Sequence, residues 1–328
     1  MNNKREPVLI AEHVKKYFPI TGVFGQVENH VKAVDDVSLT LYKGETYGLV
    51  GETGCGKSTL GRTLISLLPA TSGSIRYNGM DLAALKGGEA RAIRKSVQMI
   101  FQDPYTSLNP RKRIGDILTE AMAIHNLGDK SSRMDAAVEL MDKVGLRVEF
   151  FYRYPHEMSG GQRQRVGIAR ALILNPEIIV CDEPVSALDV SVQSQIINLL
   201  LQLQKERQLT YLFISHDMSV IRHTSDTIGV MYLGHLVEEA ETAELFAAPM
   251  HPYTQVLLSA VPSPDPHKKK ERVVLEGDLP SPIDPPSGCV FHTRCPMAQE
   301  ICSKEVPQMQ TVNDRHRVAC HLCKGREE

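Results

Sequence analysis

The sequence predicts an α/β fold with a mainly parallel sheet, and three observations support this prediction. Short, fully apolar runs at residues 178–181, 211–214 and 228–232 are typical of parallel strands that are buried on both faces. Stretches with helical periodicity separate these runs, as crossover connections between parallel strands require. A glycine-rich loop also joins an apolar strand to a helix within residues 45–68, which is the arrangement of a phosphate-binding loop.

The composition is that of an ordinary globular protein. A chain of 328 residues with 42% hydrophobic residues is long enough for two domains with their own cores. Acidic and basic residues are intermixed and the net charge is −2, so nothing indicates a surface for nucleic acid. No run approaches the roughly 20 apolar residues that span a bilayer, and the polar start lacks a signal segment. We therefore expect a cytoplasmic protein that does not bind nucleic acid.

The glycine-rich loop, GETGCGKS at residues 51–58, has the pattern of a nucleotide-binding P-loop. Its glycines let successive backbone N–H groups point at phosphate oxygens, and the following helix, predicted over residues 60–68, adds its positive end. Lys57 can reach the β- and γ-phosphates, and the Ser58 hydroxyl can ligate Mg²⁺. The residues predicted to contact the nucleotide are Gly51, Thr53, Gly54, Cys55, Gly56, Lys57, Ser58 and Thr59.

The segments around this loop are predicted to differ in secondary structure. Strands are expected at residues 8–14, 37–41, 74–77 and 97–101, because short apolar runs there are bounded by turn residues. From about residue 109 to 146, apolar residues recur at helical spacing instead. We therefore predict a strand-rich region followed by a helical insert.

Polar side chains that follow the strands are predicted to carry the chemistry. Asp182 and Glu183 end one buried strand: Asp182 can hold Mg²⁺ opposite Ser58, and Glu183 can orient and polarise the attacking water. His216 follows the next strand and can donate to the γ-phosphate. Gln102 follows the strand at 97–101, and its amide can approach both Mg²⁺ and the water. This set is sufficient because phosphoryl transfer needs mainly positioning and charge neutralisation.

A second glycine-containing helix start occurs at Ser159-Gly160-Gly161-Gln162. Ser159 is expected to cap the helix, and the exposed glycine amides with the helix dipole make an anion site. One mononucleotide cannot readily use two such helix starts on one compact domain. We therefore predict that these four residues contact a γ-phosphate that is bound by another subunit.

In order and spacing, these motifs together with Ser186-Ala-Leu-Asp189 resemble the ATP-binding cassette of ABC transporters. The resemblance implies a P-loop NTPase fold with a parallel-sheet core, an antiparallel β subdomain and a helical subdomain at about residues 104–160, all within residues 1–240. It implies a head-to-tail dimer in which two ATP molecules lie between the P-loop of one cassette and the Ser-Gly-Gly-Gln of the other. Gln102 and the helical insert would contact a membrane subunit, and Asp189 would lie at the dimer interface. Tyr17 or Phe18 would stack on adenine.

Further segments resemble the ATPase subunits of oligopeptide and dipeptide importers, most closely the second, F-type subunit of the pair. These segments are FQDPYTSLNPR at 101–111, HPYT at 251–254, LLSAVP at 257–262 and PPSGC at 285–289. The resemblance implies a heterodimer with a homologous ATPase subunit, two transmembrane permease subunits and an extracytoplasmic solute-binding protein. The chain would be peripheral on the cytoplasmic face of the membrane. Nickel or another small solute remains an alternative cargo, and a non-transport ABC ATPase is the alternative from a different class.

The C-terminal region is predicted to be a small extension, residues 241–328, with a metal site. Seven prolines between Pro262 and Pro286 indicate an extended connection, and five of the seven cysteines follow it. Four thiolates can hold tetrahedral zinc or an iron–sulfur cluster. The resemblance to peptide-importer ATPases favours a [4Fe–4S] cluster, structural or regulatory, with Cys320 preferred over Cys323 as the fourth ligand. The ligands would be Cys289, Cys295, Cys302 and Cys320.

Overall fold

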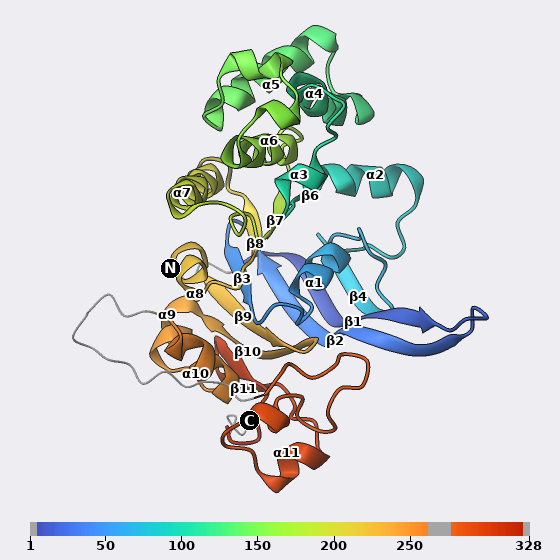
Figure 1. Cartoon of the computed structure of the whole chain (residues 1–328), viewed down its shortest axis with the longest axis vertical. Helices are drawn as coiled ribbons and strands as arrows, with labels where there is room; N and C mark the ends of the chain where they lie inside the picture. The colour runs from blue at the N-terminus through green and yellow to red at the C-terminus, as the bar shows by residue number, and fades with distance from the viewer. Residues whose placement is uncertain (1–4, 262–276, 324–328) are drawn as a thin grey trace. The chain divides into compact units, whose positions relative to one another are not determined.

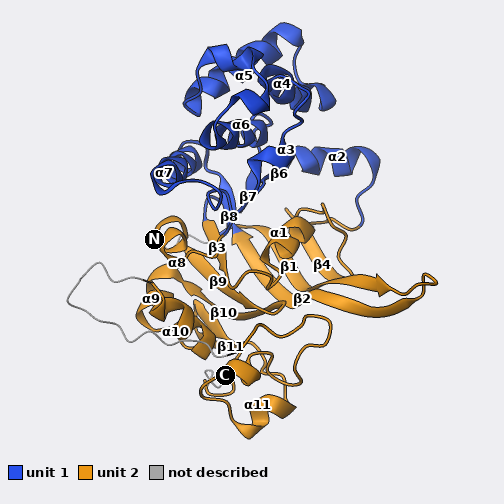
Figure 2. Cartoon of the chain, in the orientation of Figure 1, with its two compact units in different colours: residues 1–6, 42–45, 84–214 blue, residues 7–41, 46–83, 215–328 orange. Residues whose placement is uncertain are grey.

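The computed structural model describes residues 5–261 and 277–323. The first part of the predicted proline-rich connection, residues 262–276, lies outside the described residues. The described chain forms two compact units, shown in separate colours in Figure 2. Unit 1 comprises residues 5–6, 42–45 and 84–214, and unit 2 comprises residues 7–41, 46–83, 215–261 and 277–323. The chain therefore passes between the units several times.

The strands of unit 1 are parallel, as the apolar runs predict. β7 (Ile178–Asp182) lies between β6 (Val97–Ile100) and β8 (Thr210–Ile214) and pairs with both in parallel register. Every residue of β7 and β8 is buried, which explains why their sequences show no alternation of polar and apolar residues. β7 ends at Asp182, and Glu183 follows directly, so both predicted acidic residues lie at the carboxyl end of this strand.

Helices make up the rest of unit 1, and the helical insert is confirmed. Figure 1 shows the insert helices α4 and α5 in green. Ile114, Ile117 and Leu118 are buried on α4, at the spacing the sequence predicts. Gly115 of the same helix packs so closely on Phe151 that an added Cβ would lie 2.2 Å from its ring. The helices are α2 (Gly87–Ser96), α3 (Pro104–Ser107), α4 (Ile114–Ile124), α5 (Lys130–Lys143), η1 (Val148–Tyr152), η2 (Pro155–Glu157), α6 (Gly160–Leu172) and α7 (Val190–Arg207).

An antiparallel sheet in unit 2 has the strand order β2-β1-β4-β5. β1 (Pro7–Thr21) and β2 (Val27–Tyr42) are longer than the apolar runs within them, whereas β4 (Ser72–Tyr77) matches its prediction and β5 (Met80–Asp81) is short. The half of the β1–β2 pair that is next to the turn joining the two strands is mostly exposed or half-buried. Burial imposes no hydrophobic pattern there, so pattern reasoning could not find the extra length.

A second group of strands in unit 2 has the order β11-β12-β10-β9-β3 and contains the P-loop strand β3. β3 (Thr46–Val50) pairs in parallel with β9 (Thr227–Tyr232), and β10 (His235–Glu241) continues antiparallel to β9. The C-terminal hairpin of β11 (Gln310–Asn313) and β12 (His316–Val318) extends the same group, because β12 pairs with β10. The helices here are α1 (Lys57–Leu64), α8 (Met218–Thr224), α9 (Thr242–Ala247), α10 (Pro252–Ser259), η3 (His292–Arg294) and α11 (Glu300–Lys304).

Two details of unit 2 bear on the predicted boundaries. Helix α1 ends at Leu64, earlier than expected, and Ser66 follows with a φ of 56°, a left-handed conformation that a helix cannot continue through. The described residues after 240 cluster with unit 2, and β10 itself crosses this position. Within the described ranges, no helix is both long and apolar enough to cross a membrane.

Candidate functional site

The P-loop of unit 2 has a backbone that glycine alone accommodates at two positions. Gly51 has a φ of 154° and Gly56 a φ of 104°, and a Cβ at either would lie about 2 Å from a backbone oxygen, 2.1 Å from Met231 O and 2.0 Å from Ala33 O. These close approaches hold the loop against β9 and β2. The turn leads directly into α1, whose N-cap is Gly56.

The side chain of Lys57 folds back onto the loop residues that precede it. Its Nζ donates to the carbonyl oxygens of Gly51 at 2.7 Å and Glu52 at 2.9 Å, and the residue is only 4% exposed. The ammonium is thus held by two backbone carbonyl groups at the start of the loop. Thr53 and Gly54 are exposed at the tip, Cys55 is buried, and Ser58 and Thr59 are half-buried at the helix start. All eight predicted loop residues are therefore grouped at one place.

Tyr17 and Phe18 are neighbours on β1 with different surroundings. The Tyr17 hydroxyl donates to Asp35 at 2.6 Å, and Lys15 pairs with the same carboxylate at 3.1 Å. Burial and the bond to Asp35 raise the pKa of Tyr17 to about 12. The ring of Phe18 instead has the Lys16 ammonium over its face, 4.9 Å from the centroid. The ring of Tyr17 is therefore held in place by the hydrogen bond of its hydroxyl, whereas Phe18 has no polar group that could do this.

His216 follows β8 in the chain and belongs to unit 2. It is exposed, and the next residue, Asp217, caps α8 by accepting a hydrogen bond from Ser219 N at 2.7 Å. The capped helix fixes the backbone on the C-terminal side of the histidine.

Gln102 and Glu183, both predicted to act on the attacking water, meet in unit 1. Gln102 Nε2 donates to Glu183 Oε2 at 2.8 Å. Glu183 has a φ of 44°, a strained backbone for a non-glycine residue, and its N–H donates to Ile214 O at 3.0 Å. Asp182 is fully buried at the end of β7. Asp189 is exposed and caps α7 by accepting from Val192 N at 3.0 Å.

The Ser-Gly-Gly-Gln segment begins α6 with a reciprocal cap. Ser159 N donates to Gln162 Oε1 at 2.9 Å, and Gln162 N donates to Ser159 Oγ at 3.4 Å. Gly161 packs against α7, where an added Cβ would lie 2.6 Å from Val192 Cγ1. The predicted serine cap is confirmed, and Ser159 itself is exposed.

The C-terminal cysteines form a loose group. Burial raises the pKa of Cys289 to about 11, and the thiols of Cys302, Cys320 and Cys295 add to this rise, so these four lie within electrostatic range of one another. The Cys323 thiol donates to Met250 O at 3.8 Å. Over residues 5–261 and 277–323, no three or more His, Cys, Asp or Glu side chains are arranged to hold a metal ion.

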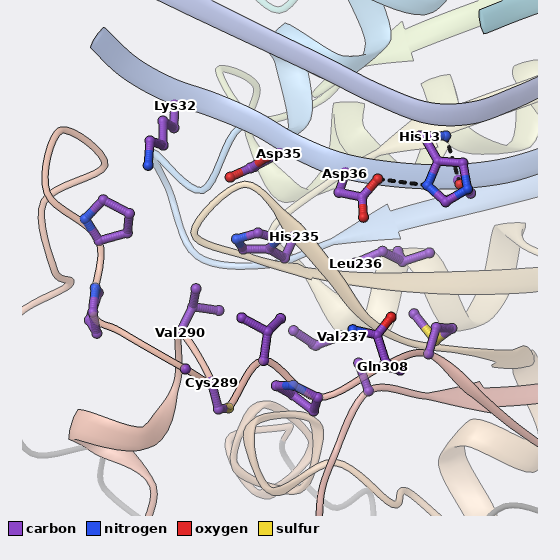
Figure 3. A pocket seen from close by; sticks show the side chains of 18 of the residues that line it. His13, Lys32, Asp35, Asp36, His235, Leu236, Val237, Cys289, Val290 and Gln308 are labelled. Atoms are coloured by element: carbon purple, nitrogen blue, oxygen red, sulfur yellow. Dashed lines mark hydrogen bonds and ion pairs between the residues drawn. The ribbon is translucent and has the colours of Figure 1, made fainter. Parts of the chain in front are cut away.

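A cavity of about 650 Å³ lies beside this group in unit 2 (Figure 3). Residues of β1, β2 and β10 line it together with residues of the C-terminal segment, Cys289 among them, and both groups contain polar and apolar side chains. No P-loop residue is among the described residues that line it. The cavity is therefore distinct from the phosphate-binding loop.

Comparison with known proteins places the chain in a family. The sequence profile of the ABC transporter family matches residues 34–186, and that of the oligopeptide/dipeptide transporter C-terminal region matches residues 237–302. The chain is 55% identical to the oligopeptide transport ATP-binding protein AppF of Bacillus subtilis, covering 97% of this chain and 98% of AppF. The chain belongs to the ABC transporter ATP-binding proteins. OppF of Escherichia coli, also an oligopeptide transport ATP-binding protein, is 53% identical over 90% of each chain.

Solved structures support the same fold. The ATP-binding cassette MJ0796, in a dimeric post-hydrolysis state bound to ADP and Pi, matches with a TM-score of 0.64 and 28% identity. The match covers 71% of this chain and 98% of that cassette. The chain is therefore an ATP-hydrolysing ABC subunit that uses ATP and Mg²⁺.

Two residues at the P-loop were not predicted. The side chains of Tyr253 and Arg294 both contact Glu52, the second residue of the loop. Tyr253 lies in the HPYT segment and Arg294 directly precedes Cys295, so each is next to a motif that the sequence singles out. The motifs gave no indication of a contact with the loop, because some 200 residues separate them from it along the chain.

Proposed function

We propose that this chain powers the import of oligopeptides or dipeptides. The match of residues 237–302 to the oligopeptide/dipeptide transporter C-terminal region carries this proposal, since it lies outside the ATP-hydrolysing motifs and distinguishes one ABC subfamily from others. AppF and OppF, both oligopeptide transport proteins by name, support it over nearly the whole chain. Nickel or another small solute is the alternative cargo.

In this proposal the ATP site has contributions from two chains. The P-loop binds the phosphates, with Ser58, Asp182 and Gln102 holding Mg²⁺, and Tyr17 stacks on adenine in preference to Phe18. Glu183 orients the attacking water, a role that its bond to Gln102 supports. His216 donates to the γ-phosphate. The α6 start at residues 159–162 and Asp189 act on the nucleotide of the partner cassette, which the exposed Ser159 cap supports.

The partner in the dimer is a homologous ATPase subunit, so that the working cassette pair is a heterodimer. Two transmembrane permeases, contacted through Gln102 and the helices of residues 104–160, form the path of the peptide. An extracytoplasmic solute-binding protein delivers it, and the chain lies on the cytoplasmic face of the membrane. Residues 1–240 form the cassette and residues 241–328 the extension.

The extension holds a [4Fe–4S] cluster through Cys289, Cys295, Cys302 and Cys320. The mutual effect of these thiols on the pKa of Cys289 supports this set, and Cys323, whose thiol lies beside that of Cys320, is the alternative fourth ligand. Anaerobic purification should give brown protein with about four irons per chain, lost in C302S and kept in C323S. Iron-free wild-type protein would contradict the cluster.

The cargo is tested in the assembled transporter. The complex is purified with its own permeases and partner cassette, reconstituted in vesicles, and supplied with its solute-binding protein on one side and with ATP on the side of the ATPase subunits. Uptake of radiolabelled peptides should depend on ATP, and Ni²⁺ should not be taken up. Uptake of Ni²⁺ in place of peptides would overturn the peptide assignment and leave the ATPase assignment intact.

A further inference from the structure

The C-terminal segment contacts the P-loop through the side chain of Arg294. This arginine ends η3, and its two terminal nitrogens reach both carboxylate oxygens of Glu52, at 2.8 and 3.3 Å. The side chain of Arg294 is 9% exposed and that of Glu52 28%. A contact in which two N–H groups meet both carboxylate oxygens fixes the orientation of the two side chains and also pairs their charges.

The other polar groups of Glu52 are engaged as well. Its N–H donates to the Tyr253 hydroxyl at 2.8 Å, and its carbonyl oxygen accepts from Lys57 Nζ at 2.9 Å and from Cys55 N at 3.3 Å. The contacts from Tyr253 and Arg294 come from residues 237–302, the region that distinguishes the subfamily. Glu52 is thus held in place both by residues of the loop and by two residues of the C-terminal segment, Tyr253 and Arg294.

Packing places both contacting residues firmly. The rings of Tyr232, Tyr253 and Phe291 meet at centroid distances of 4.8 to 5.4 Å, and Arg294 donates weakly to the Tyr232 hydroxyl at 3.4 Å. Arg294 Nε is buried and has no hydrogen-bond partner among the described residues. Its polar interactions therefore depend mainly on Glu52.

The charge of Glu52 would be unfavourable in a loop that binds polyphosphate. A carboxylate within a few ångströms of phosphate oxygens repels them unless a cation neutralises it. We propose that Arg294 is a positioning residue for ATP binding: it holds Glu52 away from the phosphates and neutralises it, so that the C-terminal segment sets the affinity of the P-loop for ATP.

The proposal predicts a specific pattern in a double-mutant cycle. Arg294→Met leaves Glu52 uncompensated, so the Kd and KM for ATP should rise about tenfold while kcat at saturating ATP stays within about twofold. Glu52→Gln removes the charge itself and should bind ATP within about twofold of wild type. The double variant should also bind ATP within about twofold of wild type, because nothing then needs neutralisation.

The cycle is measured in the full-length chain within its transporter complex, with a fluorescent ATP analogue for Kd and thermal unfolding as a check of folding. Arg315→Gln, which removes an ion pair to Glu241 elsewhere in the extension, is the matched control and should leave Kd unchanged. Arg294→Lys keeps the cation without the two-pronged contact and replaces Arg294→Met if that variant does not fold; it should weaken binding about threefold. Equal weakening of ATP binding by the arginine variant in the wild-type and Glu52→Gln backgrounds would overturn the proposal, as would loss of kcat alone.

Discussion

Single residues of the two units show how much of the ATP chemistry a sequence can specify. The P-loop and the acidic pair at the end of β7 follow from motifs because their residue types and spacing are fixed by phosphate and metal chemistry. The left-handed backbone of Glu183 and the contact of Arg294 with Glu52 do not follow, since no local pattern encodes either. Both depend on what the fold places next to these residues.

The surroundings of Tyr17 and Phe18 differ, and we propose that Tyr17 is the ring that stacks on adenine. Tyr17→Ala should weaken ATP binding about tenfold, because stacking of a base on an aromatic ring is worth about 1–3 kcal/mol. Phe18→Ala should change binding less than about twofold, since Lys16 already covers a face of that ring. Tyr17→Phe keeps the ring and serves as the control. Calorimetric titration with ATP measures all three, and a larger effect of Phe18→Ala would reverse the assignment.

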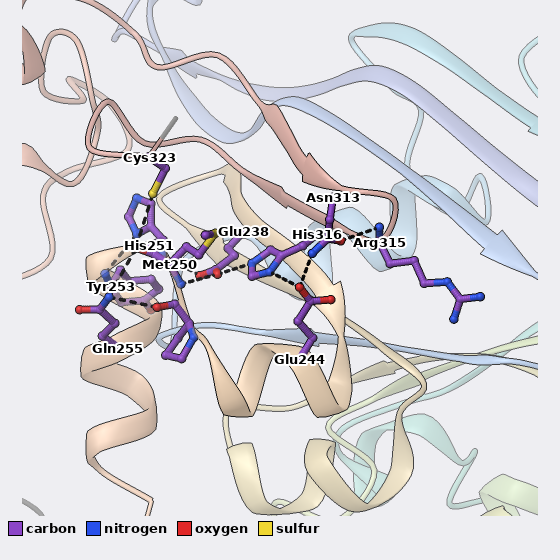
Figure 4. A network of polar contacts seen from close by, with 11 residues as sticks. Glu238, Glu244, Met250, His251, Tyr253, Gln255, Asn313, Arg315, His316 and Cys323 are labelled. Carbon is purple, nitrogen blue, oxygen red and sulfur yellow. Dashed lines mark hydrogen bonds and ion pairs between the residues drawn. The ribbon is translucent and has the colours of Figure 1, made fainter. Parts of the chain in front are cut away.

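Among the secondary-structure elements, β10, β12 and α9 share a buried polar network (Figure 4). Glu238 on β10 is fully buried and accepts from His316 Nε2 at 2.7 Å, from Met250 N at 2.7 Å and from His251 N at 3.0 Å. His316 also pairs with Glu244 of α9 at 3.1 Å. In addition to its pairing with β10, the C-terminal hairpin is therefore held to the rest of unit 2 by His316, which lies between two carboxylates.

This network predicts a pH dependence of stability. Burial opposes charging of His316, but the bonds to Glu238 and Glu244 outweigh it and raise its pKa above 6.5. The stabilisation is therefore complete below about pH 6.5 and is lost as pH rises through the folded-state pKa. His251 has the opposite effect on stability. Burial lowers its pKa to about 4, so the free energy of unfolding decreases as pH falls from 6.5 towards 4.

Denaturant unfolding between about pH 6.5 and 9 tests the His316 contribution. Wild-type stability should fall with rising pH, and His316→Gln should remove most of this slope. His223→Gln, at an exposed histidine on α8, is the control and should keep the slope. A slope that is unchanged in His316→Gln would show that His316 does not carry the effect.

Element lengths differ in how well the sequence predicts them. The fully buried β7 and β8 and the amphipathic α4 agree with their patterns, because burial fixes which residues they contain. The outer part of the β1–β2 pair was not found, since few of its residues are buried, and the β11–β12 hairpin was not found because its strands are only four and three residues long. The hairpin instead depends on pairing with β10, which lies about 80 residues earlier in the chain.

The whole molecule combines an ATP-hydrolysing cassette with an extension that contacts its P-loop. The family, the fold and ATP hydrolysis follow from the ordered motifs and from relatives that match the chain over nearly its full length. The motifs do not predict the link between the extension and the loop, because its polar contacts, the Arg294–Glu52 ion pair and the Tyr253 hydroxyl contact, join residues far apart in the chain. We propose that ATP hydrolysis by this chain drives the import of peptides.

ATP turnover by the purified transporter complex with Glu183→Gln in this chain tests the central claim most directly, provided that the matching substitution is also made in the partner cassette. The steady-state rate should fall at least about 100-fold, because the group that orients the attacking water is lost. ATP should remain bound and the cassette dimer closed, since the substituted amide keeps the hydrogen bonding of the site without the charge of the carboxylate. Hydrolysis within about tenfold of wild type, or loss of ATP binding, would contradict the account.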